Sequence, residues 1–65
     1  MITVNGEPTV FTPDLTVKKL LHQKNFIFPL LIVKIDGVYV PREAYDITPI
    51  PDRAVVDVIH LISGG

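Results

Sequence analysis

Residue types that carry chemistry are scarce in this chain, and the most distinctive candidates are the last two residues of the sequence, Gly64 and Gly65. Glycine loses the most backbone entropy on folding and has no side chain to pack, so a glycine pair does nothing to hold a strand in a sheet. Two interpretations follow. The pair is either an incidental tail, of the kind that frays at the end of many domains, or a segment whose carboxylate is the working group.

The side chains themselves offer little support for catalysis. The chain has no cysteine, which excludes disulfides and any thiol chemistry, and its two histidines, His22 and His60, are far apart in the sequence. We interpret His60 as a structural or edge histidine rather than an acid or base, and His22 as part of a solvated helix surface. We therefore expect no metal site and no bound cofactor.

Length and composition narrow the class of protein further. Sixty-five residues make one domain, too small for a deep enzyme pocket, yet 48% hydrophobic residues suffice for a compact fold. The net charge of −1 argues against binding to nucleic acid, which requires an excess of positive charge to pair with the phosphates. The longest apolar run, 26–33, is too short to span a membrane, and the N-terminus lacks the pattern of a signal peptide. We expect a cytoplasmic protein.

The first two elements are a hairpin and a helix. Residues 2–5 and 8–12 are β-rich and flank Asn5-Gly6, the dipeptide that favours a type I′ turn. The next segment predicts a helix over 16–24, with Thr16 as N-cap and Asn25 in a left-handed conformation at its end. Its apolar residues recur at the spacing of one helix face: Val17, Leu20 and Leu21.

The rest of the chain predicts three strands. An apolar strand over 30–35 is followed by a two-residue turn at Asp36-Gly37 and a short strand over 38–40. A single helical turn at 42–45 precedes the last strand, over 54–62. Alternation divides that strand into two faces, one made of Val56, Val58, His60 and Ile62 and the other of Val55, Asp57, Ile59 and Leu61.

This order of elements predicts the fold class. One helix must bury its apolar stripe against one face of a sheet, and the last strand pairs most economically beside the first, in the middle. The expected fold is therefore α+β, a β-grasp or ubiquitin-like domain with a mixed sheet of four to five strands packed on one helix. In this arrangement the final residues project freely from the sheet.

Four stretches of the sequence are distinctive: "ITVNGEP" at the start, "LTVKKLL" opening the helix, "VKIDGVYVPREAY" in the middle and the terminal diglycine. Through these stretches, essentially the whole chain resembles the ThiS family of sulfur carriers in thiamin biosynthesis. Two features depart from the family pattern. Pro51-Asp52-Arg53 replaces a Gly-Asp turn before the last strand, and the segment 26–28 is more apolar than is common.

The resemblance implies a specific chemistry for residues 1–65 as a single carrier domain. An E1-like, ThiF-type adenylyltransferase would use ATP to adenylate the Gly65 carboxylate, and a sulfur donor such as a cysteine desulfurase would then displace AMP to leave a thiocarboxylate. A thiazole synthase of the ThiG type would accept the sulfur. Residues 63–65 would form the flexible reactive tail, in which Gly65 and Gly64 leave the carbonyl unobstructed and Ser63 is small enough to follow them.

The same reading assigns the protein no catalytic side chain of its own, so it is not an enzyme but a protein co-substrate of its partners. It also suggests where partners bind. Ile59 and Leu61, beside Asp57, lie on the sheet face that a single helix covers least, and exposed apolar clusters rimmed by polar groups mark interfaces. We interpret these three residues as a docking patch.

Other functions fit parts of the pattern. The small subunit of molybdopterin synthase, which is MoaD-like, shares the fold, tail and activation, and another thiocarboxylate carrier would do so as well. A ubiquitin-like protein modifier would end with Gly65 in an amide bond to a lysine. A β-grasp binding module would have a C-terminal tail that takes part in no reaction.

Overall fold

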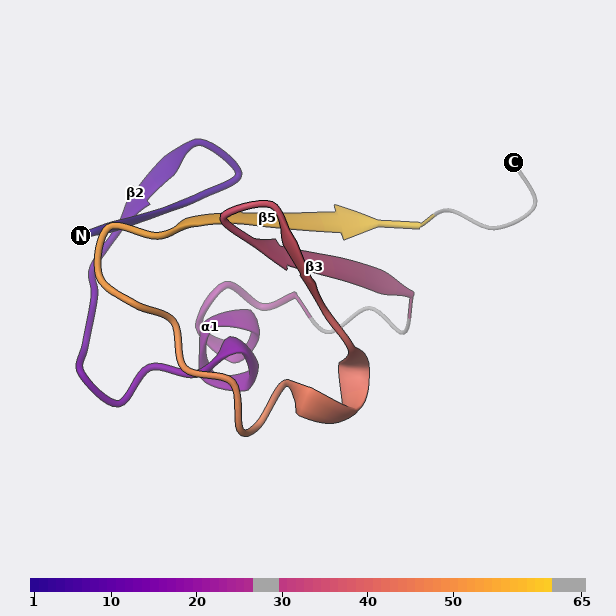
Figure 1. Cartoon of the computed structure of the whole chain (residues 1–65). Helices are drawn as coiled ribbons and strands as arrows, with labels where there is room; N and C mark the ends of the chain where they lie inside the picture. Colours follow the sequence, from indigo (N-terminus) through magenta and orange to yellow (C-terminus); the bar gives the residue numbers. More distant parts are fainter. Residues whose placement is uncertain (27–29, 62–65) are drawn as a thin grey trace.

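The computed structural model describes residues 1–26 and 30–61. In chain order the elements are β1 (Ile2–Val4), β2 (Glu7–Thr9), α1 (Val17–Gln23), β3 (Leu31–Ile35), β4 (Val38–Val40), the 3-10 turn η1 (Arg42–Ala44) and β5 (Val55–His60). The five strands form one sheet in the order β2-β1-β5-β3-β4, and α1 lies against one side of it (Figure 1). The predicted β-grasp fold is confirmed.

The last strand occupies the middle of the sheet, as predicted. β5 runs parallel to β1, where Thr3 is opposite Val55, and antiparallel to β3, where Leu31 is opposite His60. The remaining pairs, β1 with β2 and β3 with β4, are antiparallel hairpins. A central position gives β5 two hydrogen-bonded neighbours, so the strand that leads to the C-terminal residues is well anchored.

The core forms where the apolar stripe of α1 meets the inner face of the sheet. On the helix Val17, Leu20 and Leu21 are buried, as their spacing predicts. They pack against residues of the strands and loops that are each at most 2% exposed: Ile2, Val4, Leu15, Val33, Ile50, Ala54 and Val56. Each aliphatic side chain of this size contributes roughly 1.5–3 kcal/mol by leaving water, which is how a 65-residue chain without disulfides sustains a fold.

The ends of α1 follow the sequence prediction to within a residue. Thr16 is the N-cap, and its hydroxyl oxygen accepts a hydrogen bond from the backbone N–H of Lys19 at 3.3 Å. Asn25 has φ of 60°, the left-handed conformation that ends the helix. The helix is slightly shorter than predicted, Val17–Gln23 in place of 16–24, with Thr16 and Lys24 as its caps.

The first hairpin differs from its prediction in the second strand. Asn5 and Gly6 have φ of 51° and 83°, which confirms the tight turn with two positive φ angles. However, β2 covers Glu7–Thr9 rather than 8–12. The reason is register: a two-residue turn places Thr9 opposite Ile2, and β1 begins at Ile2, so residues beyond Thr9 have no strand to pair with.

The remaining predicted turns are present. Asp36 and Gly37 have φ of 50° and 82° between β3 and β4. The unusual segment before β5 closes a turn in which the N–H of Ala54 donates to the carbonyl of Pro51, with Arg53 at φ of 65°. The departure from the family's Gly-Asp turn therefore leaves the strand connection intact. The last strand is shorter than predicted, Val55–His60 in place of 54–62, and Ile62 lies outside the described residues.

The side chain of Asn5 also forms hydrogen bonds to β5, which its position in the turn does not predict. Its Oδ1 accepts from the backbone N–H of Val58 at 2.8 Å, and its Nδ2 donates to the Val58 carbonyl at 3.2 Å. The backbone pairing of β1 with β5 ends with the N–H of Asn5 donating to Val56. The Asn5 side chain therefore continues the pairing by two residues along β5.

We expect Asn5→Ala to lower the free energy of unfolding by about 2–3 kcal/mol, because it removes two part-buried hydrogen bonds and places alanine at positive φ. Asn5→Gly loses the same bonds but adopts positive φ freely, so its loss should be smaller, about 1–2 kcal/mol. Urea denaturation of both variants measures these losses. Equal stability of Asn5→Ala and the parent protein would contradict this role.

Candidate partner-binding face

The chain leaves the sheet at the end of β5. The backbone N–H of Leu61 donates to the carbonyl of Leu30 at 2.9 Å, one residue beyond the strand, so the pairing with β3 continues to Leu61. The predicted reactive tail, Ser63 to Gly65, lies outside the described residues. The structure describes the strand that leads toward these residues, as far as Leu61, and the surface beside that strand.

The two faces of β5 differ sharply in exposure. Val56 and Val58 face α1 and are 0% and 9% exposed, whereas Val55 and Ile59 face away from the helix and are 50% and 44% exposed. Leu61 is 44% exposed. The predicted division into a core face and an uncovered face is confirmed for Val56 and Val58 on one side and Val55 and Ile59 on the other, whereas His60, predicted on the core face, is exposed.

The strand register extends the uncovered face across three strands. Asp57 is opposite Lys34 on β3, which in turn is opposite Tyr39 on β4, while Ile59 is opposite Ile32. Directly opposed residues project to the same side of a sheet. We call this surface the open sheet face, made of Ile32, Lys34, Tyr39, Val55, Asp57, Ile59 and Leu61.

The open sheet face is apolar with a charged centre. Tyr39 is 59% exposed, which adds a large aromatic side chain to the exposed aliphatic residues of β5. Lys34 and Asp57 are neighbouring opposite charges on adjacent strands, half-buried within the apolar surround. A surface of this kind suits a partner that offers apolar side chains together with groups that pair with one acid and one base.

Four residues of this face were not among the predicted docking residues: Ile32, Lys34, Tyr39 and Val55. The signal that finds Tyr39 is the two-residue turn at Asp36-Gly37, which requires Ile35 to be opposite Val38 and hence Lys34 opposite Tyr39. The pairing of β3 with β5 has no such local signal, because the two strands are separated by a long connection.

The described residues contain no cluster of side chains suited to bind a metal ion. Within residues 1–26 and 30–61, no three His, Cys, Asp or Glu side chains gather as a metal site would require. His60 is exposed at the end of β5, with its Cα opposite that of Leu31, and His22 is exposed on α1. The structure does not bring the two histidines into one described site.

The fold and this face together define a small β-grasp protein that presents its C-terminal strand, with an apolar sheet surface beside it. Comparison with known proteins gives the family. The model of the ThiS family matches residues 2–65, and the chain belongs to this family. Membership makes it a small carrier protein of the ThiS type, and the match includes the terminal glycines.

A solved structure supports the same assignment. The crystal structure of a thiamine biosynthesis protein (ThiS) from Geobacter metallireducens is 30% identical in sequence, with a TM-score of 0.82. The alignment covers 98% of this chain and 97% of that one. A search of the curated proteins returned no match.

Membrane insertion through a helix has no structural support in the described ranges. α1, at seven residues, is far shorter than the roughly 20 residues that cross a bilayer, and no described helix meets the length and apolarity that crossing requires.

Proposed function

We propose that this protein is a sulfur carrier of thiamin biosynthesis and that its Gly65 carboxylate is the group that carries sulfur. The observation on which the proposal rests is the ThiS family match, which extends through the last residue of the sequence. The similar structure from Geobacter metallireducens, that of a thiamine biosynthesis protein, supports the same pathway.

The chemistry first activates the Gly65 carboxylate and then replaces its activated oxygen by sulfur. A carboxylate is a poor electrophile, so an oxygen of the Gly65 carboxylate first attacks the α-phosphorus of ATP, forming an acyl adenylate and releasing pyrophosphate. The terminal sulfur of a donor persulfide then attacks the carbonyl carbon and AMP leaves, which gives an acyl disulfide. A second thiol, supplied by a partner, attacks the donor's sulfur in that S–S bond, forms a disulfide with the donor and releases the thiocarboxylate. An E1-like adenylating enzyme supplies the positioning and electrostatic stabilisation for both steps, and the carrier supplies the acyl group.

The open sheet face is the surface that we propose for partner binding. It lies along the strand that leads into the tail, so a partner bound there holds the Gly65 carboxylate within reach of its active site. Its exposed apolar residues, including the predicted Ile59 and Leu61, give the contact area, and Asp57 with Lys34 gives polar specificity. The adenylating enzyme and then the thiazole synthase use this face in turn.

The test is intact mass measurement after incubation with the E1-like enzyme of the same organism, ATP and a sulfur donor. The expected result is a mass gain equal to replacing one oxygen by sulfur, in a reaction that requires ATP. An unchanged mass with an enzyme that activates another carrier would refute the proposal. Subsequent incubation with a thiazole synthase, and separately with the large subunit of molybdopterin synthase, identifies the acceptor pathway.

The rival role as a protein modifier predicts a different product. In that case Gly65 forms an amide with a lysine, and species of higher mass persist on a denaturing gel of a cell extract. A carrier yields only the unconjugated chain on such a gel.

A further inference from the structure

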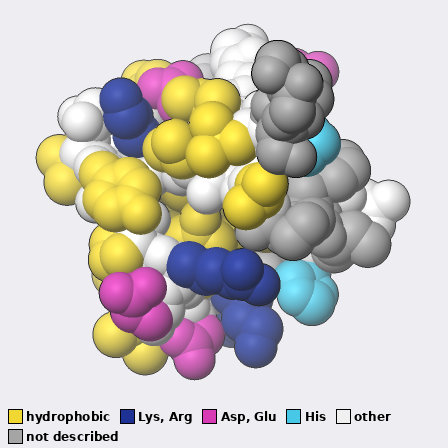
Figure 2. Space-filling view, turned by 90° about the vertical axis from the view of Figure 1, so that its right-hand side faces the viewer, with side chains coloured by type: hydrophobic (Ala, Val, Ile, Leu, Met, Phe, Trp, Pro, Cys, Tyr) yellow, Lys and Arg dark blue, Asp and Glu magenta, His cyan; other side chains and the backbone are white. Residues whose placement is uncertain are grey.

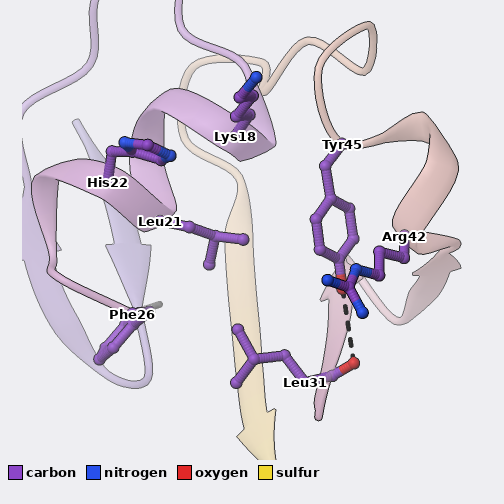
Figure 3. A pocket seen from close by; sticks show the side chains of 7 residues that line it. All are labelled: Lys18, Leu21, His22, Phe26, Leu31, Arg42 and Tyr45. Carbon is purple, nitrogen blue, oxygen red and sulfur yellow. Dashed lines mark hydrogen bonds between the residues drawn. The ribbon is translucent and has the colours of Figure 1, made fainter. Parts of the chain in front are cut away.

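A cleft lies on the helix side of the molecule, in the other layer from the open sheet face. It opens between α1 and η1, has a volume of about 220 Å³ and is lined by Lys18, Leu21, His22, Phe26, Leu31, Arg42 and Tyr45. Figure 3 shows Lys18 and His22 coming from α1 and Arg42 and Tyr45 from the opposite wall, with Leu21 pointing between the walls. The proposed sulfur chemistry uses none of these residues.

The two walls are held together by backbone hydrogen bonds. The N–H of Lys18 donates to the Tyr45 carbonyl at 2.8 Å, and the N–H of Val17 donates to the Thr48 carbonyl at 3.1 Å. The Thr48 hydroxyl donates in turn to the Ala44 carbonyl at 2.7 Å. These hydrogen bonds hold the first turn of α1 against the segment that carries Tyr45. They therefore fix the distance between the two walls of the cleft.

The floor and one side of the cleft are apolar. Phe26, Leu31 and Tyr45 are half-buried and pack against the core, and Leu21 belongs to the core. The Tyr45 hydroxyl donates to the Leu31 carbonyl at 3.4 Å, which directs the ring along the wall (Figure 3). Burial, with a smaller effect of Tyr39, raises the pKa of the Tyr45 phenol above its usual value, so this ring adds no negative charge.

The rim of the cleft is basic. Lys18 and His22 are one helical turn apart on α1, and Arg42 projects from the other wall. Among the described residues that line the cleft there is no carboxylate; Glu43 and Asp46 line a neighbouring hollow that shares Lys18, Arg42 and Tyr45. Figure 2, viewed from the side of η1, shows Lys and Arg side chains lying together beside a histidine and hydrophobic residues.

Size and chemistry together indicate the occupant. A cavity of roughly 150 Å³ holds benzene, and sites for drug-sized molecules begin at roughly 300 Å³, so 220 Å³ suits one ring with one attached group. The apolar walls select a flat hydrocarbon body. A guanidinium and an ammonium on the rim select an anion, since a guanidinium pairs with carboxylate or phosphate through two parallel hydrogen bonds.

We propose that the cleft between α1 and η1 binds a small aromatic acid, with its ring between Leu21 and Tyr45 and its phosphate or carboxylate group held by Lys18 and Arg42. A ligand of this size bound through a few charged contacts has a dissociation constant of about 1 mM. Both the ring and the charge contribute, so neither half alone binds as well.

The test is titration of the full chain, labelled with ¹⁵N, while backbone amide signals are recorded by NMR. The probes are phenyl phosphate and benzoate, with inorganic phosphate and benzyl alcohol as the two half-ligands. We expect phenyl phosphate or benzoate to shift the amides of Lys18, His22, Arg42 and Tyr45 along one saturable curve. Each half-ligand should bind at least about tenfold more weakly.

Variants locate the binding and provide the controls. Arg42→Gln and Lys18→Gln should each weaken binding about tenfold or more, because each removes a charged hydrogen bond. Glu43→Gln, which changes the neighbouring hollow, should leave affinity unchanged or increase it. The amide spectrum of each variant reports directly that the chain is folded.

Several results would overturn the proposal. Unsaturable shifts spread over the surface would show no site. Equal affinity for inorganic phosphate and phenyl phosphate would show an adventitious anion only. Unchanged affinity in folded Arg42→Gln and Lys18→Gln would place the binding elsewhere. None of these outcomes bears on the sulfur transfer at Gly65, so the two proposals stand or fall separately.

Discussion

Deleting Gly65 is expected to abolish formation of the thiocarboxylate, with no mass gain detected under conditions that convert the parent protein fully. The deleted chain still ends in a glycine, Gly64, so its loss of thiocarboxylate formation results from the shorter tail and not from steric obstruction of the carbonyl carbon. Each extended residue spans roughly 3.3–3.6 Å, and a misplacement of about 1 Å at a reacting centre costs on the order of 100-fold in rate. A tail one residue shorter therefore displaces the terminal carboxylate by more than an active site tolerates.

The Gly65→Ala variant tests the steric effect at the carbonyl carbon separately from the effect of tail length. It keeps the length of the tail and adds one methyl group beside the carbonyl carbon that the sulfur donor must approach. We expect its rate of thiocarboxylate formation to fall about tenfold or more, since one added methyl in a tightly packed site costs roughly 1–3 kcal/mol. Intact mass recorded over time measures this rate.

The fold should be unaffected by both changes, because the last backbone hydrogen bond of the described chain is made by Leu61. Thermal unfolding provides the control. Full thiocarboxylate formation by the deleted chain would show that a carboxylate at Gly64 serves equally well, and it would refute the requirement for Gly65. Failure of the parent chain itself to form a thiocarboxylate would favour the binding-module alternative.

Replacing Ile59 by aspartate is expected to reduce the rate of adenylation at limiting carrier concentration by about 30-fold or more. Ile59 lies near the centre of the open sheet face, opposite Ile32, and is 44% exposed. Truncation of a central apolar residue in an interface commonly costs 2 kcal/mol or more, which corresponds to this factor. The new carboxylate also lies two residues from Asp57 on the same face and repels it.

Ile47→Asp is the matched control for Ile59→Asp. Ile47 is an isoleucine exposed at 75%, follows η1 and does not belong to the sheet, so the same change there should leave adenylation unaffected. The measurement is the rate of pyrophosphate release as a function of carrier concentration, with thermal unfolding recorded for each variant. Equal rates for folded Ile59→Asp and Ile47→Asp would remove Ile59 from the docking surface.

Local sequence signals proved reliable where one segment decides its own conformation. Asn5-Gly6 and Asp36-Gly37 both form tight turns with positive φ, and the spacing of Val17, Leu20 and Leu21 gives the buried face of α1. The length of β2 was predicted wrongly, because it depends on where its partner β1 begins.

The docking surface shows the limit of such signals. The sequence places Ile59 and Leu61 on the uncovered side of the last strand, because side chains alternate and a single helix covers one face. It does not bring Ile32 beside Ile59 or Lys34 beside Asp57, since the register between β3 and β5 is a long-range pairing. The cleft at Lys18 and Arg42 depends likewise on how the segment after η1 is fastened to α1.

By itself, then, the sequence determined the β-grasp fold class and which face of the last strand is uncovered, and these properties depend on local periodicity and turn chemistry. The carrier role of the ThiS type and Gly65 as the candidate reactive group came from the resemblance of the whole chain to the ThiS family, which the family match supports. The tertiary structure alone decided which residues of β3 and β4 complete the open sheet face, that Asn5 supports β5, and that a basic, aromatic cleft exists. Each of these depends on contacts between segments distant in sequence, which no local pattern encodes.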